Sequence, residues 1–179
     1  MPAVIRNLPF FDRSTTVEVS GRPVPIKHDL IVVWVSISEA GIDQLHPTAP
    51  RFPAVLDTGC NHSFVMRERH LIEWGGIHPD YLRRLRSIRI YGSLVPQMAA
   101  NVWLHPNRAG HRDDFSGQPL FLIESEPGIA VVPKAVGDGN PRLPLLGLRA
   151  LRWNRLHLAI DGDRRRVNIR TRRRFWLSR

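Results

Sequence analysis

An aspartate in a glycine-containing turn is the residue of this sequence best placed to do chemistry. The segment 54–65 reads AVLDTGCNHSFV, so an apolar stretch leads directly into Asp57, which Thr58 and Gly59 follow. A carboxylate that activates water must sit at the end of a rigid element and be held by neighbouring donors. Gly59 lets the backbone approach the carboxylate, the Thr58 hydroxyl can hold the turn, and Ser63 can offer a second hydroxyl. The pattern indicates hydrolytic chemistry based on a carboxylate.

Three further segments follow this turn in a fixed order. Two apolar stretches, 87–91 and 99–104, predict the strands of a hairpin around Tyr91, Gly92 and Ser93. Farther along, two leucines and a glycine at 145–147 precede a short helix predicted over 148–153. The chain then predicts a closing hairpin, with strands at 156–160 and 166–170 around the turn Asp161-Gly162-Asp163.

In their order and spacing, these parts resemble the retropepsin-like aspartic proteases over roughly residues 24–170. The resemblance implies that Asp57 is the catalytic residue and that Thr58, Gly59 and Ser63 support its loop. It also implies that Tyr91, Gly92 and Ser93 form a flap under which an extended peptide or unfolded protein substrate binds. Cys60 stands where the family has Ala or Ser, the flap has one glycine, and the segment 105–128 is longer than a minimal member needs.

The sequence contains a single Asp-Thr-Gly, at residues 57–59. A single-lobe aspartic protease must assemble its pair of carboxyls from two chains, so the resemblance implies a homodimer in which Asp57 meets its own copy. The two carboxyls would share one proton, activate a water molecule and hydrolyse a peptide bond, which makes the chain an aspartic endopeptidase. Neither a cofactor nor a metal ion is expected, because no metal-ligand spacing or nucleotide-binding motif occurs.

Other interpretations of the same residues stay open. Asp57 by itself is more often an aspartate that only shapes a turn. The main alternative function is a catalytically silent peptide-binding or dimerisation module on the same fold, with or without contact to nucleic acid through its arginine-rich end. A third interpretation is an RNA-binding β-barrel. Cys60 and His62 are close in sequence, but no acid is placed to orient the imidazole, which favours a structural thiol over a nucleophile.

The composition restricts these alternatives. The chain of 179 residues carries a net charge of +10, but residues 164–179 hold eight arginines and no acid, which leaves only +2 for the rest. A nucleic-acid-binding face should spread its charge over the fold, so nucleic acid is possible but not favoured. With one cysteine, no apolar run long enough to cross a bilayer and no visible signal peptide, we expect a cytoplasmic protein without a membrane partner.

Short strands with frequent turn residues dominate the rest of the chain. We expect a single domain over 1–179, all-β with short helices, built as a small closed β-barrel of the retropepsin-like single-lobe type, with a basic tail at 171–179. Further strands are predicted at 15–19, 29–38, 54–56, 120–123 and 129–132. Further helices are predicted at 66–74 and 80–85.

Overall fold

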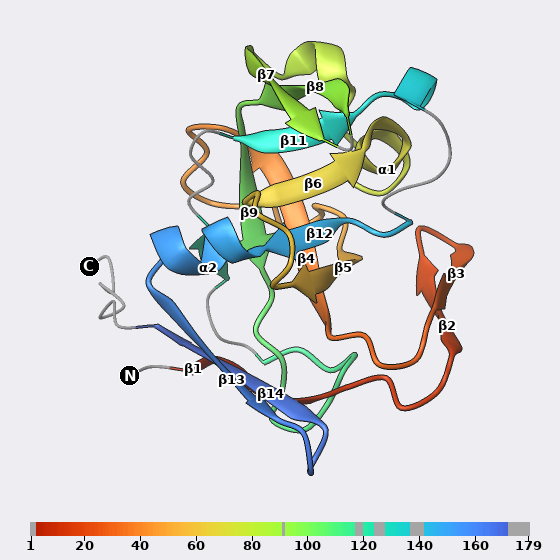
Figure 1. Cartoon of the computed structure of the whole chain (residues 1–179), viewed down its shortest axis with the longest axis vertical. Coiled ribbons are helices and arrows are strands. Elements are labelled where there is room, and N and C mark those ends of the chain that lie inside the picture. The colour runs from red at the N-terminus through yellow and green to blue at the C-terminus, as the bar shows by residue number, and fades with distance from the viewer. Residues whose placement is uncertain (1–2, 91, 117–119, 124–127, 137–141, 172–179) are drawn as a thin grey trace.

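The structure is a computed structural model that describes residues 3–90, 92–116, 120–123, 128–136 and 142–171 (Figure 1). Strands account for 49% of it and helices for 12%, so the prediction of a mainly β chain is confirmed. In the described part of the chain, no helix has the length and apolar character needed to cross a membrane. The tail, from residue 172 onward, lies outside the described residues, so the structure says nothing of its arginines.

Nine strands form the main sheet, in the order β10-β9-β4-β5-β12-β6-β11-β8-β7. Their bounds are β4 Val32–Glu39, β5 Phe52–Asp57, β6 Phe64–Arg67, β7 Arg84–Ile90, β8 Ser93–Met98, β9 Ala100–Leu104, β10 Phe121–Ile123, β11 Ile129–Val132 and β12 Leu145–Gly147. The short helices α1, Glu68–Glu73, and α2, Leu148–Trp153, follow β6 and β12 directly. Two 3-10 turns, Pro79–Tyr81 and Lys134–Val136, complete the helical elements of the described residues.

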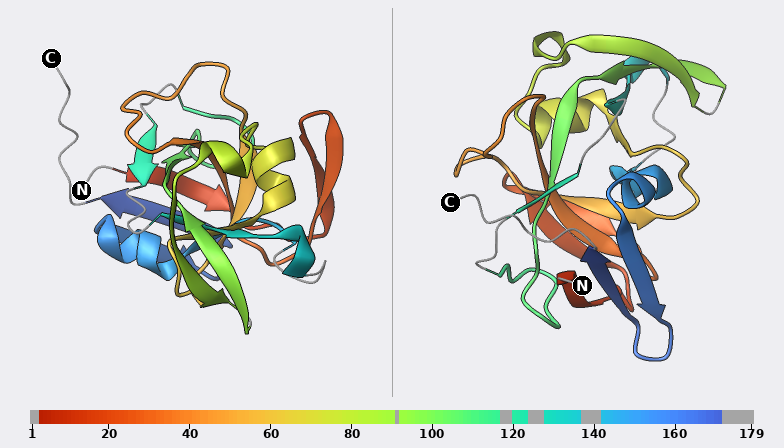
Figure 2. Two further views of the ribbon diagram at one scale, coloured as in Figure 1. Left: turned by 90° about the horizontal axis from the view of Figure 1, so that it is seen from above. Right: turned by 90° about the vertical axis from the view of Figure 1, so that its left-hand side faces the viewer.

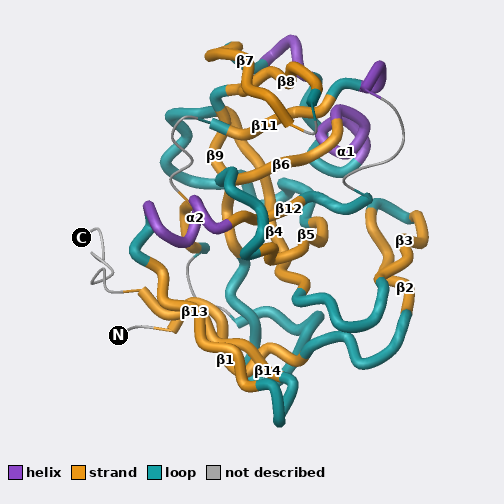
Figure 3. The backbone as a smooth tube through the Cα atoms, in the orientation of Figure 1, coloured by secondary structure: helices purple, strands orange, loops and turns teal. Residues whose placement is uncertain are grey.

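The two ends of the chain form a separate sheet. β1, Ala3–Pro9, pairs with β14, Arg166–Thr171, which pairs with β13, Leu156–Asp161. This sheet lies beside the main one, while β2, Thr15–Val19, and β3, Arg22–Ile26, make a third, two-stranded sheet (Figure 3). The expected closed barrel is not found among the described strands. The main sheet stays open because β10 and β7 lie at its opposite ends, and the terminal strands pair with each other instead of joining those ends.

The structure confirms some of the predicted helices and strands and contradicts others. The closing hairpin and the helix 148–153 form as expected. The partner of the strand at 87–90 is β8, whereas 99–104, expected in that role, corresponds to β9 and pairs with β4 and β10. The prediction of a helix over 80–85 is wrong, because a single 3-10 turn ends at Tyr81 and strand β7 begins at Arg84.

The strands that the sequence did not predict share a physical cause: each is defined by its partners rather than by its own pattern. β12 has only three residues and is fixed between β5 and β6. The first residues of the helix expected over 66–74 belong instead to strand β6, because Met66 pairs with Val131 of β11. β3 contains Pro23 and Pro25, which are tolerated because its only neighbour in the described chain is β2.

A buried apolar core holds the main sheet. Phe52, Phe64 and Leu146, one from each of β5, β6 and β12, have no exposed surface. A smaller cluster of Val65, Ile90, Val95, Ala130 and Val132 lies where the β7–β8 hairpin packs on β6 and β11. Burial of such side chains stabilises the fold by roughly 1.5–3 kcal/mol each. The three strands around the Asp57 loop are therefore anchored in the core by fully buried side chains.

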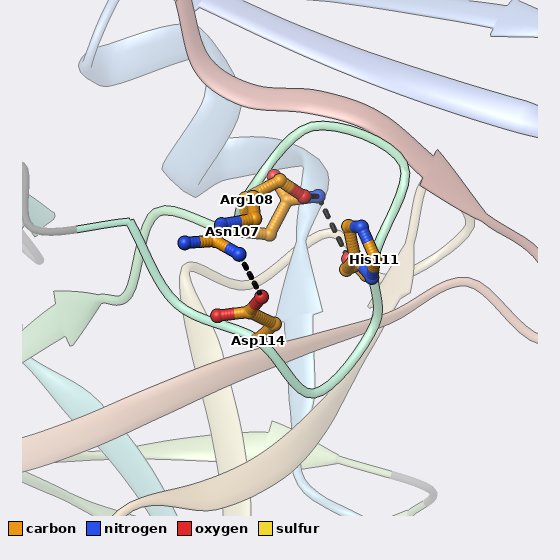
Figure 4. A network of polar contacts seen from close by, with 4 residues as sticks. All are labelled: Asn107, Arg108, His111 and Asp114. Carbon is orange, nitrogen blue, oxygen red and sulfur yellow. Dashed lines mark hydrogen bonds and ion pairs between the residues drawn. The ribbon is translucent and has the colours of Figure 1, made fainter.

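The long segment after β9 is ordered by one buried asparagine (Figure 4). The Asn107 side chain is only 4% exposed and donates to the carbonyl oxygens of Arg6, Arg108 and His111, at 2.9–3.0 Å. Its own oxygen accepts the Arg6 amide hydrogen at 2.8 Å, and Arg108 forms an ion pair with Asp114 at 3.1 Å. Asn107 thus ties the start of this segment to β1, and residues 105–116 do not line the cavity described below.

Two buried histidines make the stability of this fold sensitive to acid. Burial, aided by neighbouring arginines, lowers the pKa of His70 to about 3 and that of His105 to about 4. The Ser36 hydroxyl donates to the Pro50 carbonyl and contacts His105 Nε2 at 2.9 Å, which fits a neutral ring with its hydrogen on Nε2. Both rings are neutral in the folded chain at pH 7, whereas in the unfolded chain they take up protons near pH 6.5.

We therefore predict that the free energy of unfolding falls by a few kcal/mol as the pH drops from 6.5 towards 4. His70→Phe keeps a ring stacked on Trp74, 4.1 Å away, but cannot take up a proton, so its stability should fall less steeply over this range. Urea unfolding at several pH values measures both slopes, with His157→Gln as an exposed control. Equal slopes for His70→Phe and the wild type would contradict the assignment.

Candidate active site

The carboxyl group singled out by the sequence lies at the end of a buried strand. β5 ends at Asp57, and β12 runs parallel beside it with Gly147 in register with Asp57. The Gly59 amide donates to Asp57 Oδ1 at 2.9 Å, and the Cys60 amide donates to the Asp57 carbonyl at 3.2 Å. Asp57 is half-buried, so its carboxyl is held by the loop and still reaches solvent.

Gly147 is the second residue that fixes this loop. A Cβ atom at this position would overlap the His62 carbonyl oxygen and lie 2.6 Å from the Cys60 carbonyl oxygen. The Gly147 amide donates to the Ser63 carbonyl at 3.0 Å, and the Leu148 amide donates to the Cys60 carbonyl at 2.8 Å. Two hydrogen bonds and the missing side chain thus seat the loop 58–63 directly on the junction of β12 and α2.

The other predicted loop residues have different places. Gly59 contacts the carboxylate as described, but Thr58 is exposed and its hydroxyl has no hydrogen-bond partner in the described chain. Ser63 is buried at 3% exposure, and its hydroxyl also finds no partner among the described residues. The contribution of Ser63 to the loop is its backbone carbonyl, which accepts from Gly147.

The charge states of Cys60 and His62 oppose thiol chemistry. Burial raises the pKa of the Cys60 thiol. A hydrogen bond from the His62 backbone lowers this pKa in part, and the nearby Asp57 carboxylate raises it further. Burial, with the charge of Arg149, lowers the pKa of His62. Both shifts favour the neutral forms near pH 7, so the structure supplies no thiolate–imidazolium pair. Within the described residues, no group of three His, Cys, Asp or Glu side chains is placed to hold a metal ion.

The predicted flap is a hairpin that projects from the main sheet. β7 and β8 are antiparallel, with Arg84 opposite Met98 at one end and Ile90 opposite Ser93 at the other. Gly92, with φ of +82°, lies in the connecting turn beside Ser93. Tyr91 lies outside the described residues. The hairpin extends on the same side of the molecule as α2 and the loop after β5 (Figure 2). Gly92 and Ser93 do not line the cavity at Asp57.

A cavity of about 1240 Å³ opens beside Asp57. Its walls come from β3, the segment 27–31, the end of β5, α1 with Trp74, and residues 142–145. Arg22 of β3 and Glu73 of α1 form an ion pair at 3.1 Å that bridges two of these walls. The helix expected over 66–74 was predictable, but its place at the cavity was not, because only tertiary packing brings segments about fifty residues apart together.

The lining of the cavity is mainly apolar around a charged rim. Its apolar members include Val24, Leu30, Ile31, Leu56, Trp74 and Leu143. Charged residues on the lining are Arg22, Lys27, Asp29, Asp57, Arg69, Glu73 and Arg142. A cleft with these properties suits a substrate that buries apolar side chains next to a carboxylate. Comparisons with protein-family models, curated proteins and solved structures give no match for this chain.

We predict that Gly147→Ala displaces the Asp57 loop. The Gly147 backbone has φ of −97°, which any residue adopts, so the added methyl group acts only through its overlap with the Cys60 and His62 carbonyls. Overpacking of this kind costs about 1–3 kcal/mol of unfolding free energy. Thermal unfolding should therefore show a lower melting temperature for Gly147→Ala than for the wild type. Gly162→Ala is the matched control, since a Cβ there meets nothing within 4 Å; equal effects of the two variants would contradict the prediction.

Proposed function

We propose that this chain is a retropepsin-like aspartic endopeptidase that acts as a homodimer. The observation that carries the proposal is the setting of Asp57, which ends a buried strand, accepts a hydrogen bond from Gly59 and opens into the large cavity. A carboxyl group held in this way, beside a cleft with apolar walls, is suited to general acid–base work on a bound peptide. We place the enzyme in the cytoplasm as part of the same proposal.

The dimer follows from the chemistry of the site. One chain supplies one Asp57 carboxyl, and an aspartic protease requires two that share a proton. We propose that a two-fold axis brings the two Asp57 residues together, since an isologous contact is the commonest way for identical chains to pair. Two carboxyls a few ångströms apart cannot both ionise, so the pair carries a single proton over a range of acidic pH.

In the proposed mechanism the two Asp57 carboxyls divide the work. The ionised one removes a proton from a water molecule while the resulting hydroxide attacks the scissile carbonyl carbon. The protonated one donates a hydrogen bond to the carbonyl oxygen and stabilises the charge that develops there. When the carbon–nitrogen bond breaks, a carboxyl proton passes to the leaving amine. Each general acid or base contribution of this kind is worth about 10²–10⁴-fold in rate.

A silent module that binds peptides without cleaving them is the second candidate. The exposed Thr58 side chain and the Ser63 hydroxyl, which has no partner among the described residues, favour it, because in the described chain the loop holds the Asp57 carboxylate through the Gly59 amide alone. The two candidates share a fold and a cleft, and they differ only in whether a bound peptide is hydrolysed.

The decisive variant is Asp57→Asn. This change removes the ionisable group from both copies and nearly preserves shape, so the fold and the dimer should survive while cleavage of unfolded protein substrates falls by several orders of magnitude. The wild type should show a bell-shaped pH profile with its optimum on the acidic side of neutral, because its working state is a singly protonated pair.

Asp29→Asn is the matched control. Asp29 also lines the cavity but is exposed and lies outside the Asp57 loop, so the same change there should leave the rate and the bell-shaped profile in place. If Asp57→Asn cleaves as fast as the wild type, the aspartic-protease proposal is wrong. A wild type that binds extended peptides and never cleaves them under mildly acidic conditions supports the silent module.

A further inference from the structure

β7 leaves one side of its backbone unpaired. In the described sheet it is the terminal strand, and β8 is its single neighbour. Five of its seven residues are exposed, which leaves its outer edge open to solvent. A strand edge of this kind presents a row of amide and carbonyl groups that another extended chain can pair with.

This edge strand is also rich in arginine. Arg84, Arg86 and Arg89 lie on β7, Arg83 precedes it, and all four are exposed. Arg84 donates to the Ser87 hydroxyl at 2.8 Å, Arg86 to the Gln97 side chain at 2.7 Å and Arg89 to the Gly92 carbonyl at 3.0 Å. The guanidinium groups are thus held along the hairpin by neutral acceptors, and no carboxylate of the described residues pairs with them.

The sequence around these arginines contains no acid. No Asp or Glu occurs in residues 81–112. Within the described chain none of the four forms an ion pair, whereas four other surface arginines do, in the pairs Arg22–Glu73, Arg108–Asp114, Arg112–Asp12 and Arg164–Asp161. The hairpin is therefore a concentrated cationic surface on a body whose charge is otherwise nearly balanced.

We propose that the β7 edge binds an extended peptide with acidic side chains, which adds a strand to the sheet and pairs its carboxylates with Arg84 and Arg89. These two arginines lie on one face of the hairpin, whereas Arg86 lies on the other face with its partner Gln97. Alternate residues of an added strand lie about 6.6–6.8 Å apart on one face, the same repeat as the residues of β7. Arginine binds carboxylates through its fork of N–H donors. No residue of β7 lines the cavity at Asp57, so this surface is a second binding site and the proposal goes beyond the proposed function.

A peptide fits this surface better than a nucleic acid does. The unpaired amide and carbonyl groups of β7 find alternating partners only in another peptide backbone. The exposed side chains nearby include Leu85 and Leu94, and Leu94, on β8 opposite Arg89, is 65% exposed. Tyr81 is the one exposed aromatic near the start of β7 in the described chain, too little for a row of stacked bases.

Binding to the full-length Asp57→Asn protein tests this inference separately from catalysis. Fluorescence anisotropy compares a labelled decapeptide of alternating Glu and Thr with the same peptide carrying Lys for Glu. The Glu peptide should bind at least about tenfold more tightly, and Arg84→Gln with Arg89→Gln should weaken it by roughly two- to tenfold. Methylation of alternate peptide amides should also weaken binding, because it removes the strand hydrogen bonds.

The controls keep each outcome decisive. Arg166→Gln with Arg170→Gln removes two exposed arginines of β14 and should leave binding unchanged. Arg84→Glu with Arg89→Glu should reverse the preference towards the Lys peptide, a gain that an unfolded variant cannot produce. Equal affinity for the two peptides overturns the inference, as does an unchanged preference in the Gln variant. Tight binding of an oligouridylate that displaces the Glu peptide, with no effect of amide methylation, overturns it in favour of RNA.

Discussion

The position of Asp57 depends on the close approach of Gly147 to the loop 58–63. β12 lies between β5 and β6, so its backbone fixes where one strand ends and the other begins. Only a residue without a side chain fits against the Cys60 and His62 carbonyls. The same junction starts α2 and directs the chain into the terminal sheet. Loop, helix and terminal strands therefore take their places from one three-residue strand.

This arrangement gives the chain one carboxyl group in a fixed loop and a cavity beside it. The Asp57 carboxyl accepts a hydrogen bond from the Gly59 backbone amide, so no other side chain is needed to hold it in place. The cavity beside it is lined by β3 and α1, which the Arg22–Glu73 ion pair joins at the surface. Such an exposed pair contributes at most about 1 kcal/mol, so the buried Val24 and Ile26 of β3 do more to hold this strand in place.

Local pattern was sufficient where a segment carries its own signal. The strand before Asp57, the helix after Gly147 and the closing hairpin were predictable from apolar runs and turn residues. β12 was not, because its three residues become a strand only between two partners. The second strand of the flap was predicted at 99–104, which is β9, but the structure has β8 in that place. Pro96 weakens the strand pattern of β8, whereas β9 has the stronger β-branched and aromatic pattern. The cavity walls were beyond reach because they meet only through packing.

The central claim is that two Asp57 carboxyls from different chains form one active site, and mixed dimers test it most directly. Wild-type chain is held at a fixed amount, mixed with an equal amount of Asp57→Asn chain and allowed to exchange subunits before peptidase activity is measured. Random pairing leaves about a quarter of the dimers with two wild-type chains, so the activity per wild-type chain should fall by about half and continue to fall as the variant is increased. An activity per wild-type chain that stays constant at every ratio, in chains shown to exchange, would contradict the account.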